Sequence, residues 1–205
     1  LHRSRGLGDV YKRQRQEGMD QDLVVRAQHG DLAAFESMVV TTHPRLHGIA
    51  LGILRDAALA EDAAQQALIA IWRHIRRLRD PAKFESWSYR LLVNACYDEA
   101  KRKPGWVPEA EMPATSEPVA SDAFVGVVHR DQLDRGFRQL SLEHRAVIVL
   151  RYLYDLPMEQ VAQALDVPLG TAASRLHRAL DHLRAGLEAD ARAPMSADAA
   201  KEAVR

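Results

Sequence analysis

The sequence predicts an all-α protein built of two helical domains. Aromatic residues make up only 6% of the 205 residues, which disfavours a strand-rich sandwich. Apolar residues recur at helical spacing almost throughout the chain. The stretch from Pro104 to Ala120 holds four prolines, three glutamates and no Lys or Arg, a composition that cannot build a core. We therefore expect helical domains over 19–103 and 123–187, joined by a flexible acidic linker over 104–122.

The first domain is expected to hold four helices, whose ends are marked by helix breakers. The first is interrupted near Gly30-Asp31, and Pro44 suits the first turn of the second. Asp80-Pro81 must end the third, because proline disfavours helical backbone at the residue before it. Pro104-Gly105 stops the fourth. The expected ranges are 23–39, 44–54, 59–78 and 84–103.

The second domain is expected to contain a helix-turn-helix. Its expected helices cover 124–140, 143–150, 158–165 and 169–187. The last two are joined by a three-residue turn at 166–168, and the second of them is basic, which is the spacing of a helix-turn-helix. The alanine-rich tail over 188–205 has no strong periodicity, so we expect it to be loosely ordered.

Composition excludes several classes of protein. No apolar run approaches the roughly 20 residues needed to span a bilayer, and no secretory signal is evident, so we expect a cytoplasmic protein without membrane insertion. The single cysteine, Cys96, rules out an internal disulfide or a CxxC pair. Phosphate-binding, dinucleotide-binding and hydrolase motifs are absent. Because these motifs are absent, we expect neither an enzyme nor a cofactor. His43 and His47 have the spacing of metal ligands, but no second histidine or acidic pair accompanies them, so we expect no metal site.

The net charge of zero hides two basic blocks. Residues 67–103 carry a net charge of +5 and residues 135–187 carry +2, whereas 104–134 between them carry −5. This pattern favours two polyanion-binding surfaces on separate domains, although solvated faces without a partner would look similar.

The first 18 residues are expected to be a non-native leader. The segment from Asp9 to Gln14 looks like the translation of a transposon end used to prepare sequencing libraries, and Met19 would then be the natural start. The alternative is a basic arm that touches nucleic acid.

Two groups of motifs carry a family resemblance. The first domain has LAEDAAQQ at 59–66, IWRHI at 71–75, FESWSYRL at 84–91, then Asn94 and Asp98-Glu99. The second has LSLEHRAVIVLRY at 140–152, LPMEQVA at 156–162 and GTAASRLHRA at 170–179. Over about residues 20–187 the chain resembles the extracytoplasmic-function (group IV) branch of the sigma-70 family, the initiation subunits of bacterial RNA polymerase. The second group looks like that family's region 4.

The resemblance implies a polymerase-binding face on the third expected helix. There, Glu61, Asp62, Gln65 and Gln66 would form the polar surface that binds the clamp helices of the polymerase's largest subunit. Ile71 and Trp72 are expected to serve the hydrophobic core behind this surface. The chain departs from the family at Ala63 and Ala64, where bulkier residues are common, and at Gln66, where an acid is usual.

The resemblance also implies two DNA-binding surfaces. Opening of the minus-10 promoter element is expected to involve Lys83, Phe84, Ser86, Arg90 and Asn94. Trp87 is open to two interpretations, because its spacing to Leu91 and Ala95 favours the core whereas its indole could stack on a base. The duplex minus-35 element is expected to be read by Thr171, Ser174, Arg175, His177 and Arg178. Leu176, Ala179 and Leu183 would form the buried side of that helix.

The function implied is that of a sigma factor, which binds core RNA polymerase, recognises minus-35 and minus-10 promoter DNA and assists strand opening. The alternative is a stand-alone helix-turn-helix regulator, which would leave the first domain without a role. Whether an anti-sigma factor is a further partner is left open by the sequence.

Overall fold

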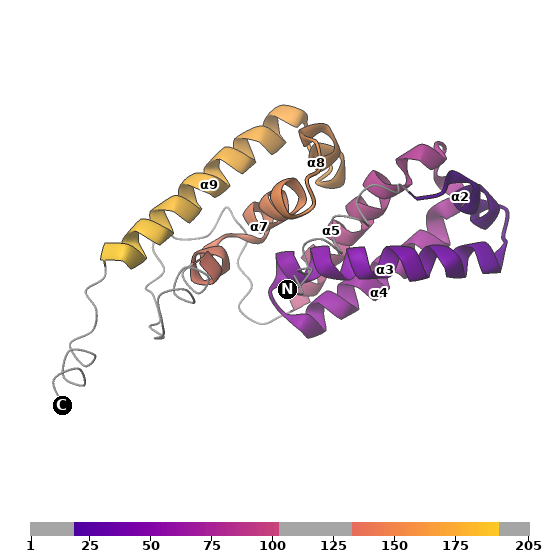
Figure 1. Ribbon diagram of the computed structural model, residues 1–205, viewed down its shortest axis with the longest axis horizontal. Coiled ribbons are helices and arrows are strands. Elements are labelled where there is room, and N and C mark those ends of the chain that lie inside the picture. The colour runs from indigo at the N-terminus through magenta and orange to yellow at the C-terminus, as the bar shows by residue number, and fades with distance from the viewer. Residues whose placement is uncertain (1–18, 103–132, 193–205) are drawn as a thin grey trace, which may run out of the picture.

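The computed structural model describes residues 19–102 and 133–192, with side chains described as far as 188. Every regular element in these ranges is helical. Figure 1 shows α2 to α5 as one bundle and α7 to α9 as a second group beside it. The expected leader and the expected linker over 104–122 lie outside the described residues. In the part of the chain that is described, no helix is both long and apolar enough to cross a bilayer.

The first domain consists of α2 (Gln21–Gln28), α3 (Leu32–Leu54), α4 (Ala57–His74) and α5 (Phe84–Arg102). Aspartates cap the first three, because each carboxylate accepts backbone N–H groups that have no partner within the helix. Asp20 accepts from Asp22 at 3.0 Å, and Asp56 accepts from Ala58 and Leu59 at 3.1 and 3.2 Å. These local caps set where α2 and α4 begin.

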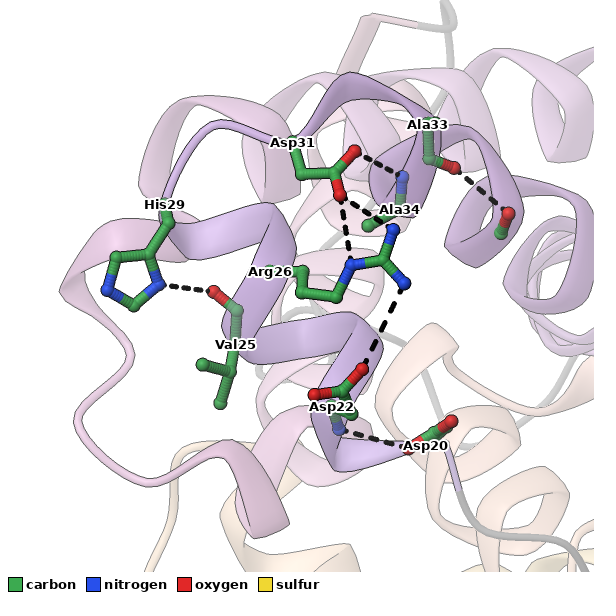
Figure 2. Close-up of polar contacts among 9 residues, drawn as sticks. Asp20, Asp22, Val25, Arg26, His29, Asp31, Ala33 and Ala34 are labelled. Atoms are coloured by element: carbon green, nitrogen blue, oxygen red, sulfur yellow. Dashed lines mark hydrogen bonds and ion pairs between the residues drawn. The ribbon is translucent and has the colours of Figure 1, made fainter.

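The corner between α2 and α3 is fixed by Asp31 (Figure 2). Its carboxylate caps α3 by accepting the N–H of Ala34 at 3.0 Å, and accepts two bonds from Arg26 at 2.9 and 2.7 Å. The Ala34 N–H and the Arg26 guanidinium together lower the pKa of the Asp31 carboxyl. Gly30 has φ +94°, a left-handed conformation that glycine adopts without strain. The interruption expected near Gly30-Asp31 is confirmed.

The separate helix expected to start at Pro44 is wrong, because α3 runs unbroken through this proline. A proline inside a helix costs about 3 kcal/mol. The apolar stripe continues across it, with Met38 on one side and Leu46 and Ile49 on the other, each at most 1% exposed. Burying each such side chain contributes about 1.5–3 kcal/mol, so packing outweighs the lost hydrogen bond.

Helix α4 packs on both α3 and α5 through a small-residue face. Ala60, Ala63, Ala64 and Ala67 are fully buried. Instead of reaching residue 78, α4 ends at His74 and tightens into the 3₁₀ turn η1 (Ile75–Arg77). A second 3₁₀ turn, η2 (Pro81–Lys83), leads into α5, so the break expected at Asp80-Pro81 is confirmed.

Cys96 on α5 is fully buried, and this gives a testable prediction. Burial raises the pKa of its thiol to about 12. An unfolded chain titrates near 8.5 and the thiolate is the reactive form, so at pH 8 a thiol-reactive dye should label the native chain more than about 1,000-fold more slowly than the denatured chain. Because only the unfolded chain ionises between about pH 8.5 and 12, the free energy of unfolding should fall as pH rises through that window. Equal labelling rates would contradict this packing.

The second domain consists of a helical segment at 133–139, then α7 (Leu142–Ile148), η4 (Val149–Leu153), α8 (Met158–Ala164) and α9 (Leu169–Arg192). Residues 124–132 of the first expected helix lie outside the described range. The helix expected over 143–150 becomes the π-helix η4 at Val149, where the N–H of Tyr154 donates to the Val149 carbonyl at 3.2 Å. The turn at 166–168 between α8 and α9 is confirmed.

Helix α9 is longer than expected. It continues to Arg192, so the loosely ordered tail expected from residue 188 is wrong for 188–192. The extension contains Glu, Ala and Arg, which are strong helix formers. Their intrinsic helix propensity favours the helix even though the segment lacks the apolar periodicity on which the sequence prediction relied. Residues 193–205 lie outside the described range.

The two domains touch each other. α8 lies against α5, and α7 and η4 lie against α3. Helix α9 packs on α7 and α8 and so forms the outer side of the second domain (Figure 1).

Candidate functional site

The first candidate surface is the polar side of α4, centred on Glu61. The Gln65 amide donates to Glu61 Oε1 at 3.0 Å. Two histidines of α3 flank the same carboxylate, with His43 Nε2 at 3.5 Å and His47 Nε2 at 3.7 Å. The Gln65 amide and the two histidines lower the pKa of the Glu61 carboxyl. This carboxylate is therefore held as an oriented anion on the surface.

The other expected residues of this face lie in solvent. Asp62, Gln65 and Gln66 are exposed, whereas the alanines on the opposite side of α4 are buried. Asp62 makes no ion pair with any residue that the structure describes. Within the described residues, no group of His, Cys, Asp and Glu has the geometry to hold a metal ion, and this includes His43, His47 and Glu61.

Trp72 was expected in the hydrophobic core, and the structure corrects this. Ile71 is 1% exposed, but Trp72 is 46% exposed and packs its ring on Phe35 of α3 at 4.6 Å between centroids. Adjacent side chains on a helix point in directions about 100° apart, so Ile71 and Trp72 could not both face the core. Gln65, Ile69 and Trp72 share one side of the helix at four-residue and three-residue spacing, and Ile69 is also exposed. From this spacing, the sequence alone could have predicted that Ile69 and Trp72 lie on the same face of the helix as Gln65.

The second candidate surface surrounds η2 and the start of α5. Lys83 and Asn94 are exposed, and Ser86 and Arg90 are half-buried. Asp80 accepts the N–H of Ala82 at 3.1 Å, and the Ser86 hydroxyl donates to the Lys83 carbonyl at 3.2 Å. These bonds hold the loop in one conformation, with a cation and polar groups on its outside.

Phe84 was expected to bind DNA, and the structure corrects this. Its side chain is 2% exposed and belongs to the hydrophobic core, so its ring is not available for stacking on a base. Trp87 is half-buried and packs on Phe84 with ring centroids 6.2 Å apart, which confirms the core interpretation of its spacing. The loop that carries Lys83 therefore lies beside a packed pair of aromatic rings, of which Phe84 is buried and Trp87 is half-buried.

The third candidate surface is the beginning of α9. Ser174, His177 and Arg178 are exposed, and Thr171 and Arg175 are half-buried. His177 is 81% exposed on its side chain and lies 3.3 Å from Asp181. The opposite side of α9 holds the fully buried Ala179, with Leu176 and Leu183 packed against the hydrophobic core as expected.

Arg175 and Arg178 differ in their surroundings. Arg175 Nε is buried without a hydrogen-bond partner among the described residues. Arg178 Nε lies 3.5 Å from the carbonyl of Ser174, at the limit of a hydrogen bond. Side chains on the first turns of a recognition helix can reach base edges and phosphates in a major groove.

Comparisons with known proteins assign both domains. The sigma-70 region 2 family model matches residues 38–104, and the sigma-70 region 4 model matches residues 136–185. The extracytoplasmic-function (ECF) RNA polymerase sigma factor SigL of Mycobacterium tuberculosis strain Erdman is 33% identical over 142 residues, covering 68% of this chain and 80% of SigL. This chain belongs to the ECF sigma factors of the sigma-70 family. The predicted all-α fold and the predicted family are both confirmed.

Further similarities agree with that assignment. ECF sigma factor SigW of Bacillus subtilis is 29% identical over 180 residues, covering 82% of this chain and 96% of SigW. The structure of CnrH in complex with the cytosolic domain of CnrY has the same fold, with a TM-score of 0.61 and 21% identity over 83% of this chain and 98% of CnrH. The chain is thus an RNA polymerase sigma factor, in which the region 2 match covers most of α3 with α4 and α5, and the region 4 match covers α7, α8 and most of α9.

Proposed function

We propose that this sigma factor divides initiation among its three candidate surfaces. The polar face of α4 binds core RNA polymerase, η2 and the start of α5 hold the opened minus-10 strand, and the first turns of α9 read the duplex minus-35 element. The observation that carries this proposal is the placement of three polar groups of side chains on three separate solvent-facing surfaces, each backed by hydrophobic core.

The polymerase-binding face is extended by apolar residues. Ile69 and Trp72 continue the side of α4 that carries Gln65, and Phe35 supports Trp72. Protein interfaces commonly combine an aromatic anchor with a polar rim. Trp72 therefore serves as the anchor of this face, and Glu61 with Asp62 provides its negative charge. His43 and His47 act as positioning residues for the Glu61 carboxylate.

Other assignments follow from the same proposal. Two solved structures with this fold are CnrH in complex with the cytosolic domain of CnrY, and the sigma factor RpoE of Bartonella quintana in complex with the anti-sigma factor NepR. An anti-sigma factor is accordingly proposed as a further partner of this chain. RNA polymerase is cytoplasmic, so the chain acts there and catalyses no reaction itself. A stand-alone regulator would not use the region 2 domain, and we do not favour that alternative.

Substitutions at the minus-10 surface test its role in strand opening. Lys83→Ala and Asn94→Ala should lower the permanganate reactivity of unpaired thymines on a duplex promoter by several-fold. Loss of the Lys83 phosphate contact should also reduce the salt dependence of single-strand binding by about 0.7 in log-log slope.

Arg184→Ala provides the matched control for charge, because Arg184 is an exposed cation of α9 far along the helix from its first turns. Opening by this variant should equal that of the wild type. If thymine reactivity is unchanged in both Lys83→Ala and Asn94→Ala, the proposed role of η2 and α5 in strand opening is wrong.

A further inference from the structure

Three arginines of the first domain lie between the motifs at 71–75 and 84–91, where the family resemblance assigns them no role. Arg76 and Arg77 belong to η1, and Arg79 follows it by two residues. All three are exposed, and none of their guanidinium groups forms an ion pair or hydrogen bond with a residue that the structure describes. Their charge is therefore presented to solvent and is not used to hold the fold.

The guanidinium of Arg76 lies at the corner between α2 and α3. A Cβ atom at Gly30 would be 3.2 Å from one of its Nη atoms, so the glycine leaves room for this group. Arg76 also lines an open cleft of about 480 Å³ together with Gln28, His29 and Leu78. The cleft thus has a cation on one side and the end of α2 on the other.

The segment that carries the arginines is fastened to α2. The side-chain amide of Gln28 donates to the carbonyl of Ile75 at 3.0 Å and to that of Leu78 at 2.6 Å. These two residues are the first residue of η1 and the residue that follows it. Both bonds hold η1 against the end of α2, so the cleft is fixed by the fold.

His29 places a further nitrogen at the cleft. Its Nδ1 is 2.7 Å from the Val25 carbonyl, which can only accept a hydrogen bond, so Nδ1 carries the proton. Figure 2 shows the other ring nitrogen, Nε2, directed away from α2. A protonated imidazole donates from both nitrogens, so His29 can add a donor for an anion.

Acidic residues near the cleft do not neutralise it. Asp31 accepts two hydrogen bonds from Arg26, and Asp22 lies 3.9 Å from the same guanidinium (Figure 2). The carboxylate of Asp80 caps η2. Residues 76–83 hold four basic residues and one acidic residue, so this segment presents an excess of positive charge.

The composition of this surface favours a nucleic-acid backbone over a protein partner. Closely spaced arginines suit successive phosphates, because each guanidinium can donate two parallel hydrogen bonds to one phosphate. Protein interfaces commonly add an aromatic or apolar anchor to their polar groups. The apolar residues of the same segment offer no such anchor, since Ile75 is buried and Leu78 is half-buried.

The arginines continue the proposed minus-10 surface. Helix α2 contacts both η1 and η2, and Figure 1 shows it at one end of the first domain. Lys83 follows Arg79 by four residues and Arg76 by seven, which are spans of at most about 14 and 25 Å. Surfaces that bind single strands cover about 4–16 nucleotides, so one strand can contact Lys83 and the arginines in succession.

We infer that a cluster of four residues, the η1 cluster, binds the phosphate backbone of the opened strand where it continues past the minus-10 surface towards the start site. The cluster consists of His29, Arg76, Arg77 and Arg79. Phosphate contacts carry no base identity, so this binding is independent of sequence. The choice of DNA as the occupant rests on the proposed function, whereas the presence of an anion-binding surface does not.

The test measures the affinity of holoenzyme for two promoter fragments over a range of salt concentrations. One fragment is unpaired over the minus-10 element alone, and the other is unpaired from that element to the start site. On the longer fragment, the double variant Arg76→Ala with Arg77→Ala should lower the log-log salt slope by about 1.4, or about 0.7 for each lost contact. Between 1 M and 0.1 M salt this difference amounts to about 25-fold. On the shorter fragment the double variant should bind like the wild type.

Two controls separate charge from structure. Arg76→Lys with Arg77→Lys keeps both charges and should restore most of the salt slope on the longer fragment. Arg184→Ala, which removes an exposed cation of α9, should match the wild type on both fragments. An unchanged slope for the double alanine variant on the longer fragment, or an equal loss on both fragments, would overturn the inference.

Affinity for core polymerase is measured separately, without DNA. The double alanine variant should bind core enzyme like the wild type, and a loss of this affinity would overturn the DNA assignment in favour of a polymerase contact. If Lys83→Ala lowers the salt slope and the double variant does not, the inference fails while the proposed function stands. If the wild-type chain does not bind core enzyme, the proposed function fails and the DNA assignment fails with it.

Discussion

Asp62→Arg is expected to weaken binding to core RNA polymerase by about 10- to 100-fold, because it places a like charge against a complementary surface. Asp62 is exposed on the polar side of α4 and makes no ion pair with a described residue, so the substitution leaves intramolecular contacts intact. The dissociation constant can be measured by titrating labelled sigma factor with core enzyme at several salt concentrations. Helicity by circular dichroism should match the wild type.

A charge-matched control is available on α5. Asp98→Arg makes the same change at an exposed residue outside the proposed polymerase-binding face and should leave the affinity for core enzyme nearly unchanged. Equal affinities for wild type and Asp62→Arg would place the polymerase-binding face elsewhere on the domain.

Arg175→Ala and Arg178→Ala are expected to impair minus-35 recognition in different ways. Loss of a base contact at Arg175 should cost about 1–3 kcal/mol and relax specificity at one base position. Loss of a phosphate contact at Arg178 should weaken binding to all sequences and flatten the salt dependence by about 0.9 in log-log slope. Both effects can be measured as holoenzyme affinity for duplex promoters over a range of salt concentrations.

Pre-opened templates separate this defect from a general loss of activity. Neither variant should impair transcription from DNA already unpaired around the start site, because duplex recognition is bypassed. Arg184→Ala again serves as the control on the same helix. If both arginine variants bound minus-35 DNA like the wild type, α9 would not be the recognition helix, and region 4 would have to be interpreted as a protein-binding domain.

The sequence predicted the faces of helices better than the places where helices meet. The family resemblance placed Asp62 and Gln65 on a polar surface, and helical spacing placed Ala179 on a buried side. Both placements agree with the structure, because each depends only on the residue's own helix. The breakers at Gly30 and Asp80-Pro81 acted as expected, since their effects are local. The helix-turn-helix was recognisable for the same reason.

The errors arose where tertiary packing overrode a local rule. Pro44 lies inside α3 because the apolar stripe on both of its sides is buried. Phe84 was given a DNA-binding role by its position in a motif, but its ring fills the core beneath the loop. The contact between the domains could not be predicted, because the helices that form it, such as α5 and α8, are far apart in the sequence and no local pattern pairs them.

The central claim, that this chain directs promoter-specific initiation, is tested most directly by transcription with purified core RNA polymerase. The template is a pool of linear duplexes with randomised minus-35 and minus-10 regions, and the 5′ ends of the transcripts are sequenced with and without the chain. The account predicts new transcripts that begin at a fixed distance from two enriched sequence elements, only when the chain is present. Identical transcripts with and without the chain, when it is added in excess over core enzyme, would contradict the account.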